Sequence, residues 1–246
     1  MSITVHITGF GRFQGVEDNP SCRLANGLVS TAIESMRDPR IHLASSRVVE
    51  VSMSAADAAL TQIFQSFPDN GSHIIVVHIG VAAGSTCFHL EEQAANDCSF
   101  RCPDETGAQP QGQCICDSFP LGSMSRTPLP LRKIAARMHE QWHPHVEVSC
   151  DAGRFLCNYI YYRSLQLAAS RQNCYSVFIH VPLHTIADLR QQTDFICEFL
   201  RCASDFILGV TVAEPPATVA EPPAHFSGCE KDPLVASNSK SGIFPS

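Results

Sequence analysis

The stretch Ser72–Val81 reads SHIIVVHIGV and decides the fold, because it is apolar at nearly every position and is bounded by Gly71 and Gly80. A strand with one face in water alternates apolar and polar residues, whereas a strand covered on both faces reads as a continuous apolar run. Strands covered on both faces are typical of parallel sheets flanked by helices. The stretch therefore predicts a central strand of a parallel sheet.

The segments on either side of this strand extend the same architecture. Upstream, the pattern predicts strands over Ile3–Ile7 and Ile41–Ser52 and helices from Asn19 to about Met36 and over Ala55–Phe67. Downstream, helices and strands resume at Pro130 and alternate to about Leu208. The repeated order of strand and helix specifies an α/β protein. We expect a three-layer α/β/α sandwich with a twisted, mostly parallel central sheet.

A change of period marks the stretch Val148–Tyr162, VSCDAGRFLCNYIYY. The polar turn Asp151–Gly153 precedes apolar residues at helical spacing, so Cys157 falls in the first turn of a predicted helix. Unpaired N–H groups and the helix dipole favour a thiolate at that position. A cysteine taken alone is more often a buried structural residue, so a partner is needed before a chemical role is assigned.

The partner lies 23 residues downstream, at His180. The run Ser176–Pro182, SVFIHVP, is β-branched and aromatic, which predicts a buried strand with His180 at its carboxyl end. Ligands of open α/β sheets gather at the carboxyl ends of strands. A single helix joins Cys157 to this strand, so the two side chains are expected to meet above the sheet. A paired Cys and His is the usual nucleophile and general base of a cysteine enzyme.

The loop after the first strand, Thr8–Gly15, reads TGFGRFQG. Its spacing is G-x-G-x-x-x-G, which differs from the dinucleotide-binding G-x-G-x-x-G and carries bulky aromatic residues where a backbone must approach phosphate. Phe10 and Phe13 suit the wall of a small apolar pocket at a strand end, with ordinary packing as the alternative.

Composition and charge exclude several classes of function. The chain of 246 residues has a net charge of −7, which argues against nucleic acid or an anionic membrane as the main partner. No apolar run approaches the ~20 residues that span a bilayer, and the N-terminus has no basic flank followed by an apolar segment. We therefore expect a cytoplasmic protein, and the sequence leaves its oligomeric state open.

The segment Ala82–Pro128 is turn-rich and poorly periodic, as lids and binding loops often are. It holds a cluster of four of the twelve cysteines, at positions 98, 102, 114 and 116. Their spacing, C-x3-C-x11-C-x-C, lacks the paired knuckles of a structural zinc site, so we expect no metal. The alternative is a metal-binding or catalytically inactive α/β binding protein that uses the Cys-rich loop 98–116.

The C-terminal segment differs in composition from the rest of the chain. Thr211–Ala217, TVAEPPA, is repeated without change as Thr218–Ala224. A Pro-rich repeat of this kind offers no core periodicity. We therefore expect a catalytic domain over residues 1–210 and a Pro-rich, disordered tail over residues 211–246.

The motifs DAGRFLCN, FIHVP and T-G-F-G-x-F together resemble the pyroglutamyl peptidase I (pyrrolidone-carboxylate peptidase) family, and the resemblance covers about Ile3–Leu208. These are cytosolic cysteine peptidases of α/β fold that remove N-terminal pyroglutamate from peptides with a Glu-Cys-His triad and no cofactor. The resemblance implies Cys157 as the nucleophile and His180 as the base.

The same resemblance implies the acid and the substrate pocket. The family's acidic residue precedes an asparagine by five positions, and Glu91 stands in that relation to Asn96, so Glu91 matches better than Glu92. The family's aromatic loop cups the pyroglutamyl ring, and it matches Phe10 and Phe13. We expect Gly80 and Val81, at the end of the central strand, to complete the pocket.

Overall fold

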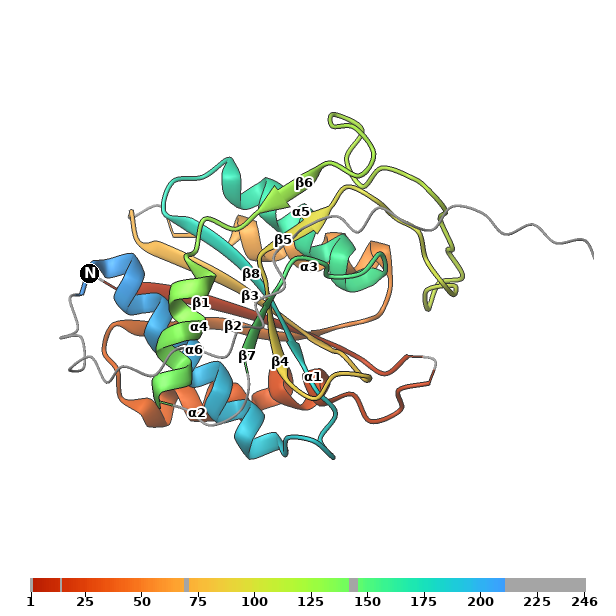
Figure 1. Ribbon diagram of the computed structural model, residues 1–246. Helices are drawn as coiled ribbons and strands as arrows, with labels where there is room; N and C mark the ends of the chain where they lie inside the picture. The colour runs from red at the N-terminus through yellow and green to blue at the C-terminus, as the bar shows by residue number, and fades with distance from the viewer. Residues whose placement is uncertain (1, 14, 69–70, 142–145, 211–246) are drawn as a thin grey trace, which may run out of the picture. The chain divides into compact units, whose positions relative to one another are not determined.

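The computed structural model describes residues 2–13, 15–68, 71–141 and 146–210, and Figure 1 shows their arrangement. Within these residues a six-stranded sheet has the order β2-β1-β3-β8-β4-β7. Its strands are β1 (Ile3–Phe10), β2 (Ile41–Val49), β3 (His73–Val81), β4 (Phe88–Glu91), β7 (Val146–Ser149) and β8 (Cys174–Val181). The tail expected over 211–246 lies outside the described residues.

Helices cover both faces of this sheet (Figure 1). One face packs against α1 (Pro20–Arg23), the π-helical segment Leu24–Leu28, α2 (Val29–Met36), α4 (Leu131–Gln141) and α6 (Leu189–Leu208). The other face packs against α3 (Met53–Gln65) and α5 (Leu156–Ala169). The expected three-layer α/β/α sandwich is confirmed, and none of the described helices has both the length and the apolarity to cross a bilayer.

The central strand β3 is buried on both faces, as its composition predicts: Ile74 to Gly80 are all buried. Two polar side chains nevertheless lie in this core, on adjacent strands. Thr8 of β1 and His78 of β3 share a hydrogen bond of 2.7 Å between Oγ1 and Nδ1. The bond provides Oγ1 of Thr8 and Nδ1 of His78 with a partner, as polar atoms removed from water require, whereas Nε2 of His78 has no hydrogen bond within the described residues.

Strand direction explains how the two ends of the sheet differ. Strands β1, β2, β3 and β8 are parallel, whereas β4 runs antiparallel to β8 and parallel to β7. The first residues of β4 therefore lie beside the carboxyl end of β8. In the register of the pair, His89 is opposite His180 and Glu91 is opposite Phe178.

The helix expected from Asn19 to Met36 is wrong in one respect, because it is broken near its middle. Asn26 and Gly27 have non-helical backbone angles, and Gly27 has φ of 114°. Glycine adopts positive φ without steric cost, so an Asn-Gly pair readily interrupts a helix. The chain forms α1, a π-helical turn and α2 in place of one continuous helix.

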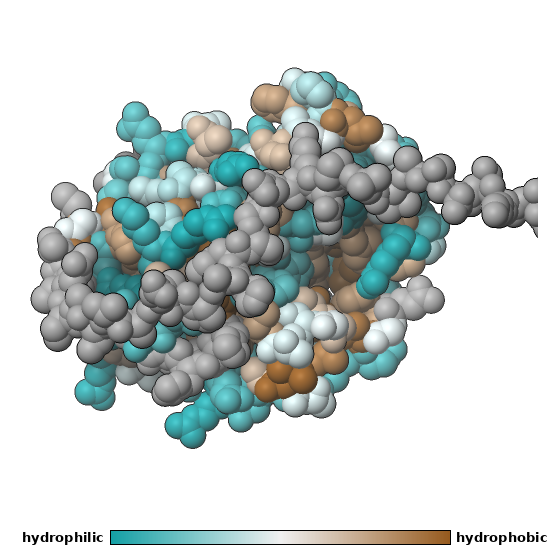
Figure 2. Space-filling model, viewed as in Figure 1, coloured by the Kyte–Doolittle hydropathy of each residue, from teal (hydrophilic) through white to brown (hydrophobic). Residues whose placement is uncertain are grey.

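The excursion over residues 82–128 contains a small two-stranded ribbon, β5 (Gln93–Ala95) paired with β6 (Met124–Arg126). The side chain of Asn96 fixes the loop between them: Nδ2 donates to the carbonyls of Cys116 and Phe119 at 2.9 and 2.8 Å. In the loop before β6, the apolar side chain of Leu121 is 52% exposed. Figure 2 shows a few hydrophobic residues at the surface on this face of the molecule. The excursion is thus held to the domain by strand pairing and hydrogen bonds, and a few of its apolar side chains lie at the surface.

Candidate active site

Cys157 is the second residue of α5, in agreement with the helix start expected from the sequence. The turn before it is held by a hydrogen bond of 3.0 Å from the Gly153 N–H to Oδ1 of Asp151. Gly153 has φ of 81°, which a residue with a side chain rarely adopts. Phe155 is the N-cap residue and has no side-chain hydrogen bond to the helix, so it leaves N–H groups of the first turn beside Cys157 without a side-chain cap.

His180 and Glu91 form a buried pair. Nδ1 of His180 lies 2.8 Å from Oε1 of Glu91, and the two residues are 9% and 1% exposed. The antiparallel register of β4 and β8 makes them diagonal neighbours, within reach of a carboxylate. Because Glu91 accepts the proton on Nδ1, the other ring nitrogen, Nε2, remains for Cys157.

The surroundings of His180 favour its charged form. Burial alone disfavours the imidazolium, but hydrogen bonds and charges of Cys157 and Glu91 outweigh that effect and raise the pKa of His180 to about 10. An imidazolium beside a cysteine is the arrangement that favours a nucleophilic thiolate. The three side chains therefore have the order of a triad, with the carboxylate orienting the ring and the ring facing the sulfur.

Glu91 and Glu92 are adjacent but point to different surroundings. The Glu92 side chain is 22% exposed, and its carboxylate lies 3.8 Å from Arg126 and 3.6 Å from Arg132. Glu92 therefore faces two arginines at the surface. Of the two carboxylates, Glu91 is the one that contacts His180.

The absence of a side chain at Gly80 leaves room for the side chain of Cys157. A Cβ atom added at Gly80 would lie 2.7 Å from Cζ of Phe178, closer than real Cβ atoms approach their neighbours, and 3.0 Å from Sγ of Cys157, closer than most of them do. Gly80 is also paired with His180 in the register of β3 and β8, and Val81 follows it at the strand end, half-buried. Backbone at the end of β3 therefore approaches the sulfur directly.

Phe10 and Phe13 belong to the same apolar cluster as Cys157, on the α3–α5 side of the sheet. Phe10 is buried, with its ring centroid 6.5 Å from that of Phe178. Phe13 is half-buried, with its centroid 6.4 Å from that of Phe155. The structure thus brings both aromatic residues to the site, with Phe13 the more accessible of the two.

Two residues that sequence reasoning missed hold the backbone around the candidate site in place. Asn158 is fully buried and binds the backbone of Ala95 in both directions, accepting at 2.8 Å and donating at 2.9 Å. The Tyr161 hydroxyl donates to the backbone carbonyl of Glu91 at 2.7 Å. Both follow Cys157 on α5, so this helix positions Cys157 and also holds the backbone at Glu91 and Ala95. In the sequence, the one signal for such a role is that Asn158, a polar residue, directly follows Cys157.

The alternative of a metal site in the Cys-rich loop is not favoured. Across residues 2–210, apart from the undescribed positions, no group of three metal-ligating side chains includes a cysteine of the loop 98–116. Asn96 holds the loop instead, through its bonds to backbone groups between Cys116 and Pro120.

Comparisons with known proteins identify relatives over most of the described residues. The pyroglutamyl peptidase family model matches residues 3–197. A pyrrolidone-carboxylate peptidase of Pyrococcus furiosus is 33% identical over 180 residues, 72% of this chain and 80% of the relative. One of Clavibacter michiganensis is 30% identical over 185 residues, 74% of this chain and 79% of the relative.

A solved structure gives the same result. A mutant pyrrolidone carboxyl peptidase from the hyperthermophile Pyrococcus furiosus has a TM-score of 0.70 and 25% sequence identity, covering 83% of this chain and 99% of the other. The family match extends from β1 into α6 and includes Glu91, Cys157 and His180. The chain therefore belongs to the pyroglutamyl peptidase family.

Proposed function

We propose that this chain is a cysteine peptidase that hydrolytically removes N-terminal pyroglutamate from peptides. One observation carries the mechanism: a buried His180–Glu91 pair, 2.8 Å between Nδ1 and Oε1, stands beside a cysteine in the first turn of a helix. Membership of the pyroglutamyl peptidase family supports the choice of substrate.

In the first half of the reaction, the Cys157 thiolate attacks the carbonyl carbon that links pyroglutamate to the next residue. The negative charge on the carbonyl oxygen is stabilised by N–H groups of the first turn of α5, as in other oxyanion holes. When the tetrahedral intermediate collapses, the C–N bond breaks and His180 gives its proton to the departing amine. Pyroglutamate is left as a thioester on the sulfur.

In the second half, water replaces the amine. His180, now neutral, takes a proton from the water, whose oxygen attacks the thioester carbon. The C–S bond breaks, free pyroglutamate leaves, and the thiolate–imidazolium pair is restored. Glu91 holds the ring in one tautomer and stabilises the imidazolium in each cycle.

The substrate pocket follows from the chemistry of the ring. Pyroglutamate is small and uncharged, with one N–H and one C=O, so it requires apolar walls and a few backbone partners. Phe10 and Phe13 are the proposed walls. The backbone at Gly80 and Val81 is the proposed source of polar partners, because it adjoins the Cys157 sulfur.

The activity is tested by fluorophore release from a pyroglutamyl amide, measured with and without a thiol reductant. Turnover of the pyroglutamyl amide and a requirement for reduced thiol are expected. The prolyl amide, which lacks the ring carbonyl and therefore carries a protonated ring amine, should be a poor substrate, because the polar partners of that carbonyl are left unpaired and a charge would enter an apolar pocket. Equal turnover of both amides would contradict the proposed specificity.

The proposed setting is the cytoplasm, where the nucleophile stays reduced, with pyroglutamyl peptides as partners and without nucleic acid or membrane. The proposed catalytic domain is residues 1–210. The limit before residues 211–246 is proposed from the repeated sequence of that segment. Subcellular fractionation tests the compartment, and a truncated chain tests the domain limits.

A further inference from the structure

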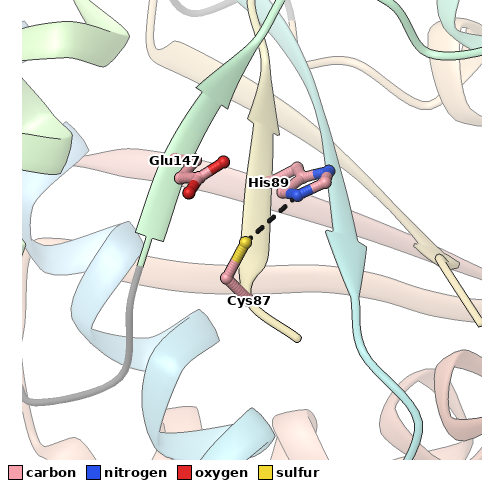
Figure 3. A group of neighbouring side chains, drawn as sticks. All are labelled: Cys87, His89 and Glu147. Carbon is pink, nitrogen blue, oxygen red and sulfur yellow. Dashed lines mark hydrogen bonds between the residues drawn. The ribbon is translucent and has the colours of Figure 1, made fainter. Parts of the chain in front are cut away.

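A second cluster of reactive side chains lies outside the proposed triad. Cys87, His89 and Glu147 each direct one potential ligand atom to a common point, and the three atoms all lie within 4.8 Å of one another. Figure 3 shows the Cys87 sulfur against the His89 ring, with the Glu147 carboxylate pointing toward them from the next strand. The proposed mechanism uses none of the three.

The backbone of two strands brings these side chains together. Cys87 directly precedes β4 and His89 is the second residue of this strand, and residues two positions apart in extended backbone point to the same face of a sheet. Glu147 is paired with His89 in the parallel register of β7 and β4. Neighbours in register project on the same face, so the carboxylate stands beside the imidazole. The cluster is thus fixed by strand pairing, although Cys87 and Glu147 are 60 residues apart in the sequence.

Distances within the cluster suit two ligands of one metal ion. Sγ of Cys87 lies 3.2 Å from Nε2 of His89. Zinc bound tetrahedrally, with Zn–S of about 2.3 Å and Zn–N of about 2.0 Å, separates sulfur and nitrogen by roughly 3.5 Å. The present separation therefore requires an adjustment of a few tenths of an ångström. Oγ of Ser85 forms a hydrogen bond of 3.2 Å with the same ring nitrogen, and this bond would be broken when the nitrogen binds the ion.

The chemistry of the donors selects the kind of ion. A set of one sulfur, one imidazole nitrogen and one carboxylate oxygen suits Zn²⁺, whereas Ca²⁺ and Mg²⁺ prefer oxygen ligands throughout. Glu147 is exposed and Cys87 and His89 are half-buried, so an ion has a path from solvent. We propose that Cys87, His89 and Glu147 form a Zn²⁺ site, with water as the fourth ligand.

The proposed site lies next to the catalytic groups. His89 is directly opposite His180 in the register of β4 and β8, so both project on the same face of the sheet. The ion would therefore bind at the edge of the active site while leaving the triad residues unligated.

Titration with Co²⁺, a spectroscopic substitute for Zn²⁺, tests the site in the reduced full-length chain. The Cys157→Ser background is used so that the catalytic thiol cannot contribute a ligand. We expect one equivalent of Co²⁺ to bind with the thiolate-to-metal charge-transfer absorption of a cysteine ligand and the intense visible bands of four-coordinate Co²⁺. Addition of Zn²⁺ should abolish both.

Further substitutions in this background assign the ligands. Cys87→Ser should remove the charge-transfer absorption, and His89→Gln and Glu147→Gln should each weaken binding at least tenfold. Cys102→Ser, which alters a half-buried free cysteine of the excursion, should leave the titration unchanged. Because Glu147 is exposed, Glu147→Gln is expected to fold even if Cys87→Ser does not.

Three results would overturn the proposal: no stoichiometric binding of Co²⁺, a charge-transfer absorption that survives Cys87→Ser, or unchanged affinity in Glu147→Gln. The last two would assign the metal to another set of ligands.

Discussion

The replacement Glu91→Gln isolates the charge of the buried carboxylate while keeping its shape. The Gln side chain still offers an oxygen to Nδ1 of His180, at the position where Glu91 now accepts at 2.8 Å. The substitution removes the negative charge that faces the His180 imidazolium. Both residues are buried, with Glu91 1% and His180 9% exposed.

The magnitude follows from the role of the acid in a triad. In a Ser-His-Asp triad, the same acid-to-amide replacement lowers kcat by about 10⁴. We therefore expect Glu91→Gln to lower kcat by roughly 10²–10⁴, which corresponds to about 3–5 kcal/mol at about 1.4 kcal/mol for each factor of ten in rate. Because Glu91 acts on the imidazole and contacts no part of the substrate in the proposed pocket, kcat should fall more than KM rises.

The pH profile gives a second, independent reading of the same substitution. Burial opposes the imidazolium, and the side chains of Cys157 and Glu91 together raise the pKa of His180 to about 10. Loss of the Glu91 charge removes part of this support, so the pKa of His180 falls. The protonated form that donates to the leaving amine is then lost at lower pH, and the alkaline limb of kcat/KM should move to lower pH.

The assay is fluorophore release from a pyroglutamyl amide over a range of pH, with Glu92→Gln as the matched control. Glu92 lies near the surface, where its carboxylate forms long ion pairs with Arg126 and Arg132 and accepts a hydrogen bond of 3.5 Å from Cys150 Sγ, so its neutralisation should change kcat less than threefold. A larger loss for Glu92→Gln than for Glu91→Gln would refute the assignment of the acid. Equal small losses would mean that another group orients His180.

Three further predictions concern the frame around the site. Gly80→Ala places a Cβ 2.7 Å from Phe178 and 3.0 Å from the Cys157 sulfur, so urea unfolding should show a loss of about 1–3 kcal/mol and turnover should fall; wild-type values for both would contradict the close approach. Burial lowers the pKa of His78 to about 3, so below pH 6.5 the unfolded chain binds a proton at His78 that the folded chain does not. His78 should therefore lower the free energy of unfolding by up to about 1.4 kcal/mol for each pH unit below 6.5. In urea unfolding at pH 6.5 and pH 4, the free energy of unfolding should fall less in His78→Gln than in wild type, and equal falls would contradict this prediction. Removal of residues 211–246 should leave kcat/KM and the melting temperature unchanged, since the repeat offers no core periodicity; a shift of more than a few degrees would contradict this.

The sequence was sufficient for the features that depend on local period. The apolar run of β3 predicted a strand covered on both faces, and the turn before Phe155 predicted a helix start at Cys157. These predictions succeeded because burial pattern and capping geometry are encoded within about ten neighbouring residues.

Features that depend on distant pairing were not available from the sequence. Nothing in the segment around β4 indicates that the strand runs antiparallel to β8, yet this direction places Glu91 beside His180. The three-residue strands β5 and β6 are too short to show a period. Asn158 reads as an ordinary helix residue until its partner Ala95, 63 positions away, is seen.

The measurement that tests the central claim most directly is turnover of a pyroglutamyl amide by Cys157→Ser, compared with wild type and with Cys102→Ser. The proposal is that the Cys157 thiolate is the nucleophile, and a serine hydroxyl is far less ionised at neutral pH. Cys157→Ser should therefore fold normally and lose at least ~10³ in kcat, while Cys102→Ser retains wild-type turnover. Near wild-type turnover by a folded Cys157→Ser protein would contradict the account.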